Sequence, residues 1–76
     1  MKREKTIFDY SKLKGYMKEK EITQEKLSKK SNISITTINQ NLKLGRPFRV
    51  ENIIEIAKVL NIAPTDISYY FFRIKV

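Results

Sequence analysis

Residues 22–44, ITQEKLSKKSNISITTINQNLKL, constrain the fold most strongly because they specify two short helices joined by a tight turn. Thr23 is a good N-cap for the first helix, since its hydroxyl can accept a hydrogen bond from an unpaired backbone N–H of the first turn. Asn32 stands where the chain must reverse, and asparagine is one of the few non-glycine residues that tolerate a left-handed backbone. In the second helix, Ile38 and Leu42 are four residues apart and therefore lie on one apolar face.

The segments around this stretch predict three more helices. Leu13 and Met17 mark the buried stripe of a first helix that ends near residue 20. Gly45 can adopt a positive φ and end the second helix of the pair. Apolar residues recur through 50–60 as expected of a helix that spans a core, and one more helical turn is predicted at about 64–68. The chain is therefore expected to be all-α with five helices.

The two ends of the chain are predicted to be non-helical. Residues 1–6 are charged and lack periodicity, which is typical of a flexible tail. Residues 69–76, YYFFRIKV, are rich in strand-forming side chains and predict an extended segment. A strand needs a partner, so this segment can cover the core, pair with Ile7–Phe8, or pair with its own copy in a second subunit.

The absence of cysteine and histidine from the 76 residues disfavours several kinds of chemistry. Without either side chain, disulfides and zinc sites are not expected, and the commonest general bases and nucleophile partners are missing. We therefore expect no catalytic residues, no cofactor, no metal site and no small-molecule substrate. No signal peptide and no apolar run of the roughly 20 residues needed to span a membrane are present, so a cytoplasmic protein without membrane contact is expected.

Positive charge is concentrated on one part of the chain. The net charge is +8, and residues 22–49 hold six basic side chains against a single acidic one. Residues 50–76 hold three of each and are neutral overall. A local excess of basic side chains is expected of a protein that binds the phosphate backbone of a nucleic acid.

The paired helices resemble the helix-turn-helix of the lambda-repressor/Cro-like family of DNA-binding proteins. The residues that carry the resemblance are Gln24, Leu27, Ser28, Asn32, Ile33 and Ile38. LGRPF at 44–48 and IIEIAKVLNI at 53–62 are similar to small Cro-like or repressor-like proteins of Gram-positive phages. The similarity extends over about residues 8–72 and implies one lambda-repressor-like DNA-binding domain covering 1–76, with its motif at about 23–44.

The second helix of the motif enters the DNA major groove in this family, so its outward side chains are candidates for base contact. These side chains are Ile35, Thr36, Asn39 and Gln40. Amide groups can bond bidentately to adenine, and the methyl groups of Ile35 and Thr36 can contact thymine. The resemblance and the basic charge also imply phosphate contacts by Thr23, Gln24, Thr37, Lys43, Arg46 and Arg49.

The resulting hypothesis is sequence-specific binding of double-stranded DNA by a phage-type transcriptional regulator, a Cro-like repressor with its recognition helix at about 34–44. One motif reads one half-site, which favours a homodimer on an inverted-repeat operator, formed in solution or only on DNA. The predicted dimer interface consists of Tyr70, Phe71, Phe72 and Ile74. Two alternatives stay open: a protein-interaction module that binds a repressor or antitoxin partner through the aromatic tail, and DNA binding without sequence preference.

Overall fold

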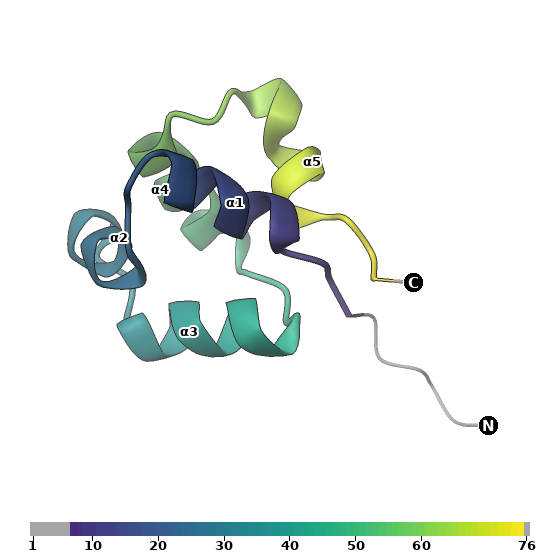
Figure 1. The fold of residues 1–76 in the computed structure, drawn as a ribbon, viewed down its shortest axis with the longest axis horizontal. Coiled ribbons are helices and arrows are strands. Elements are labelled where there is room, and N and C mark those ends of the chain that lie inside the picture. Colours follow the sequence, from purple (N-terminus) through teal and green to yellow (C-terminus); the bar gives the residue numbers. More distant parts are fainter. Residues whose placement is uncertain (1–6, 76) are drawn as a thin grey trace.

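The computed structural model describes residues 7–75, which form five α-helices and one short 3-10 turn (Figure 1). The elements are α1 (Ser11–Glu19), α2 (Gln24–Ser31), α3 (Ile35–Leu44), α4 (Val50–Leu60), η1 (Pro64–Asp66) and α5 (Ile67–Phe71). Helix α3 runs along one edge of the molecule, and α2 closes one end (Figure 1). The all-α prediction is confirmed. The flexible tail predicted for residues 1–6 lies outside the described residues.

The cap predicted for α2 is confirmed, and α3 has a cap of the same kind. The Thr23 hydroxyl accepts a hydrogen bond from the backbone N–H of Lys26 at 3.2 Å, and the Ser34 hydroxyl accepts one from Thr36 at 3.2 Å. Between the helices, Asn32 has φ 62° and ψ 25°, the left-handed conformation expected at this turn. These local interactions satisfy backbone groups that a helix leaves unpaired at its ends.

Ser31 is a buried polar residue just before this turn, with 5% of its surface exposed. Its hydroxyl donates to the backbone oxygen of Leu27 at 2.6 Å and accepts from the backbone N–H of Ile33 at 3.3 Å. Because burial of an unpaired hydroxyl is costly, these two bonds explain how a polar side chain is accommodated here.

Replacing Asn32 by alanine is expected to lower the free energy of unfolding by about 1 kcal/mol, because alanine bears the steric cost of a left-handed backbone. Asn32→Gly should avoid that loss, since glycine adopts positive φ freely. Urea unfolding followed by circular dichroism measures both variants. Equal stability of Asn32→Ala and the parent chain would mean that the turn does not hold this conformation.

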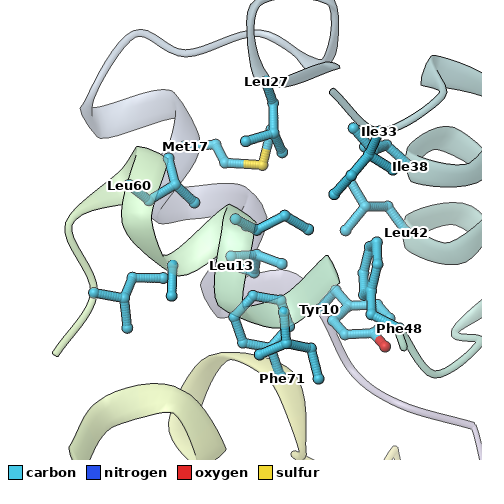
Figure 2. Close-up of a cluster of buried hydrophobic side chains, with 14 residues drawn as sticks. Tyr10, Leu13, Met17, Leu27, Ile33, Ile38, Leu42, Phe48, Leu60 and Phe71 are labelled. Carbon is cyan, nitrogen blue, oxygen red and sulfur yellow. The ribbon is translucent and has the colours of Figure 1, made fainter. Parts of the chain in front are cut away.

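The core is formed by side chains from every α-helix and from the loop after α3 (Figure 2). Its best-buried large side chains are Phe71, Leu13, Leu27, Ile38, Ile56 and Leu60. Phe48 brings the α3–α4 loop into this core. The apolar stripe expected along α4 is narrower than the sequence indicates, because Val50 and Ile54 are 72% and 45% exposed.

The prediction of an extended segment over residues 69–76 is wrong for residues 69–71, because they belong to α5. Ile67, Tyr70 and Phe71 have helical spacing, and all three pack on the core. Burial of this face outweighs the strand preference of the aromatic side chains, which depends on context. Phe71 is 1% exposed, so the prediction that it forms a dimer interface is also wrong.

The remaining tail pairs with the start of the described chain. Ile74 forms an isolated antiparallel bridge with Phe8. Two backbone hydrogen bonds flank the bridge, from the N–H of Asp9 to the oxygen of Arg73 at 2.7 Å and from the N–H of Lys75 to the oxygen of Ile7 at 2.8 Å. Of the three arrangements expected for the tail, the structure shows cover of the core by its first residues and pairing with Ile7–Phe8 by its last.

The paired ends are fastened to the C-terminal end of α3. Phe8 donates its backbone N–H to the oxygen of Gly45 at 2.9 Å, and Gly45 ends α3 with φ 70° as predicted. The hydroxyl of Tyr10 donates to the backbone oxygen of Arg46 at 2.6 Å. Burial raises the pKa of Tyr10 to about 12, so this donor stays protonated at neutral pH. Residues 7–10 therefore fix the position of the loop that leaves α3.

Candidate nucleic-acid interface

The outward face of α3 is polar and open to solvent. With 3.6 residues per turn, Thr36 and Gln40 project from the side opposite the buried Ile38, and both are exposed. Asn39 is also exposed and lies toward α2, where its amide nitrogen donates to the Gln24 side-chain oxygen at 3.1 Å. Ile35 is 42% exposed at the start of the helix. The four residues predicted to contact bases are thus accessible from outside the domain.

The hydrogen bond between Asn39 and Gln24 links the two helices of the motif through their exposed side chains. From the sequence, Asn39 is expected to contact bases and Gln24 to contact a phosphate, and a bond between the two amides is not expected. Their contact depends on how α2 crosses α3, which side-chain spacing along one helix does not reveal. Because the bond uses the oxygen of Gln24, the NH₂ group of that amide remains available to donate to a phosphate.

A polar hollow lies on one side of α3 and collects one group of the predicted phosphate-binding residues. Thr37 and Gln40 line it from α3, while Arg46 and Arg49 line it from the loop that follows. Arg49 is 3.9 Å from Glu51, but both side chains are more than 70% exposed, and ion pairs of this kind contribute little to stability. The Arg49 guanidinium therefore remains free to exchange Glu51 for an anion.

The other predicted phosphate-binding residues lie on the opposite side of α3. Thr23 and Gln24 line a hollow between α1 and α3 together with Lys14 and Lys18 of α1. Lys43 lines a neighbouring hollow with Lys14 and with Lys75 from the tail. Lys14, Lys18 and Lys75 are not among the site residues predicted from the sequence. The sequence does indicate that the two lysines of α1 lie beside its buried face, because each directly follows a residue of the buried stripe.

The residues predicted to form a dimer interface do not share one exposed surface. Phe71 is buried, and Tyr70 is half-buried with its ring centroid 5.0 Å from that of Tyr16. Phe72 and Ile74 remain 48% and 62% exposed. These last two are the more exposed members of the set, whereas Tyr70 offers only part of its surface and Phe71 almost none.

Comparison with known proteins agrees with this architecture. No helix within residues 7–75 is long and apolar enough to cross a lipid bilayer. No curated protein sequence matches the chain significantly. The family described as the Cro/C1-type HTH DNA-binding domain matches residues 12–72, which span α1 to the end of α5. The match covers most of the chain, and the chain therefore belongs to the Cro/C1-type helix-turn-helix family of DNA-binding domains.

Proposed function

We propose that the protein is a sequence-specific transcriptional regulator that inserts α3 into the major groove of double-stranded DNA. The observation that carries this proposal is the exposed polar face of α3, bordered on both sides by hollows that basic side chains line. An α-helix fits the major groove, which displays a different pattern of donors and acceptors for each base pair. The arrangement supports a helix that reads bases between two rows of phosphate contacts.

Within this proposal the exposed side chains divide by task. Gln40 can bond bidentately to adenine, and Thr36 and Ile35 can place methyl groups against thymine. Asn39 either contacts a base or holds Gln24 in position through their mutual hydrogen bond. The proposed phosphate contacts are Thr23, Gln24, Thr37, Lys43, Arg46 and Arg49. Such contacts set the register of the protein on DNA, whereas base contacts determine its sequence preference.

The proposed biological role is repression of transcription in the cytoplasm by occupying a promoter. A phage or prophage origin rests on the resemblance of residues 44–48 and 53–62 alone. Because a single motif reads one half-site, we propose binding as a homodimer to an inverted repeat. The exposed Phe72 and Ile74 and the half-buried Tyr70 are the remaining candidates for its interface.

The test is selection of bound duplexes from a random DNA pool at physiological salt, where attraction to the backbone alone is weakened. Enrichment of an inverted repeat is expected, and sedimentation of the protein on that duplex should show two copies. Enrichment of a single half-site would contradict the dimer, and binding without any enriched motif would contradict sequence-specific recognition.

Replacing Gln40 by alanine is expected to relax the preferred base at one position of each half-site, because a bidentate contact contributes about 1–3 kcal/mol of discrimination. Binding titrations with the selected duplex and its single-base variants measure the change. Ser68→Ala is the control, since Ser68 is exposed on α5 rather than on α3. A Gln40→Ala variant that keeps the same preference at every position would remove Gln40 from base recognition.

A further inference from the structure

Two hollows adjoin one another between α1 and α3, and they share Lys14 and Leu42. The first continues past Lys18 to the start of α2, where Thr23 and Gln24 lie. The second continues in the other direction, past Lys43 to the end of α3. Of α3 itself only Leu42, Lys43 and Leu44 line these hollows, which therefore border the C-terminal part of the helix on the side that faces α1. Lys14 and Lys18 are four residues apart, so both project from the same side of α1.

The tail contributes a third lysine to this border. The bridge between Ile74 and Phe8 and the hydrogen bond from the N–H of Lys75 to the oxygen of Ile7 hold residue 75 beside the end of α3. Lys75 consequently lines the same hollow as Lys14 and Lys43. The intramolecular pairing of the tail thus places a basic side chain next to the recognition helix.

These lysines are not neutralised by the acidic side chains around them. Lys14, Lys18 and Lys75 are all exposed, and neither of the two salt bridges within residues 7–75 involves them. Asp9 is the acidic residue that lines the second hollow, and its carboxylate accepts a hydrogen bond from the backbone N–H of Ser11 at 2.9 Å. The two hollows are thus lined by one carboxylate and by four lysines, Lys43 included, and their net charge is positive.

The major groove is bounded by two phosphate backbones, one on each side of a helix that lies in it. Arg46 and Arg49 border one side of α3, and the lysines border the other. We propose that Lys14, Lys18 and Lys75, which we name the lysine rim, bind phosphates of the second DNA strand, as Arg46 and Arg49 do for the first. This inference rests on the proposed function and extends the DNA interface beyond the helix-turn-helix to α1 and the tail.

The experiment measures the salt dependence of duplex binding for the parent chain, the triple variant Lys14→Gln/Lys18→Gln/Lys75→Gln and each single variant. The logarithm of the binding constant falls with the logarithm of salt concentration with a slope of about 0.9 per phosphate contact. Each lost contact should therefore lower the steepness of this slope by about 0.9. The ratio of the binding constant at 0.1 M salt to that at 1 M salt should then fall about eightfold per lost contact. The loss should be equal for the selected duplex and for a mixed-sequence duplex.

Lys12→Gln and Lys58→Gln are the matched controls. Lys12 is exposed on α1 but two residues from Lys14, so it projects from the other side of that helix. Lys58 lies at the end of α4, paired with Glu55. Rim variants whose slopes match those of these controls would overturn the inference. That outcome is separate from failure of the proposed function, in which the parent chain would bind neither duplex or would bind both equally well. Circular dichroism of each variant verifies that the fold is retained.

Discussion

Replacing Phe71 by alanine is expected to lower the free energy of unfolding by about 3–5 kcal/mol, the usual cost of removing a buried aromatic side chain. Phe71 is 1% exposed, and its ring meets that of Phe48 edge to face at 5.9 Å. Phe48 in turn meets Tyr10 at 5.4 Å, so the three rings connect α5, the α3–α4 loop and the residues before α1. Small domains are stable by only about 5–15 kcal/mol, and thermal unfolding followed by circular dichroism should show a large loss.

The neighbouring Phe72 is a matched control because the same substitution removes the same atoms. Phe72 is 48% exposed and contacts Phe8, with ring centroids 6.2 Å apart. Its replacement by alanine should cost no more than about 1 kcal/mol, as expected for a partly exposed contact. If Phe72→Ala were the more damaging of the two, residues 69–71 would not belong to a helix that buries Phe71, and the extended tail predicted from sequence would regain support.

Phe71 and Phe72 show which part of the fold could not be predicted from the sequence. The motif was predictable because its signals are local: Thr23 and Ser34 cap adjacent N–H groups, and Asn32 sets its own backbone conformation. The tail was not, because its conformation depends on distant residues. The composition of YYFF favours a strand, whereas burial of one face of this segment favours a helix. The contact with Phe48 that accompanies this burial exists only in the tertiary structure.

The same distinction applies to the candidate site. The exposed positions of α3 follow from helical periodicity, so the accessibility of Thr36 and Gln40 was predictable. The bond between Gln24 and Asn39 requires the crossing of α2 and α3. The lysine rim requires, in addition, that α1 faces α3 across the two hollows and that the tail pairs with Phe8. No spacing along the sequence encodes those arrangements.

A second large effect is expected from Gly45→Ala, which should lower the free energy of unfolding by about 2–5 kcal/mol. Gly45 has φ +70°, a conformation that costs other residues about 1–2 kcal/mol. A Cβ placed there would also lie 2.5 Å from Cγ2 of Ile7 and 2.8 Å from the backbone oxygen of Phe8. Crowding of this kind typically costs a further 1–3 kcal/mol or so. Urea unfolding measures the sum.

Gly15 provides the opposite expectation within the same chain. It lies inside α1, and a Cβ added there meets no atom within 4 Å, so no close helix contact requires glycine at this position. Gly15→Ala should therefore raise the free energy of unfolding by about 0.5–1 kcal/mol, because alanine has the higher helix propensity. The two substitutions are chemically identical and differ only in surroundings.

The pair of glycine variants also tests the contact on which the placement of the tail depends. Ile7 and Phe8 can hold Ile74 and Lys75 beside α3 only if they are seated against Gly45, through the hydrogen bond of Phe8 and the close approach of Ile7. Should Gly45→Ala unfold at the same urea concentration as the parent while Gly15→Ala is stabilised as expected, residues 7–8 would not be seated there. Lys75 would then lose its fixed position at the end of α3, and the lysine rim would be reduced to its two members on α1.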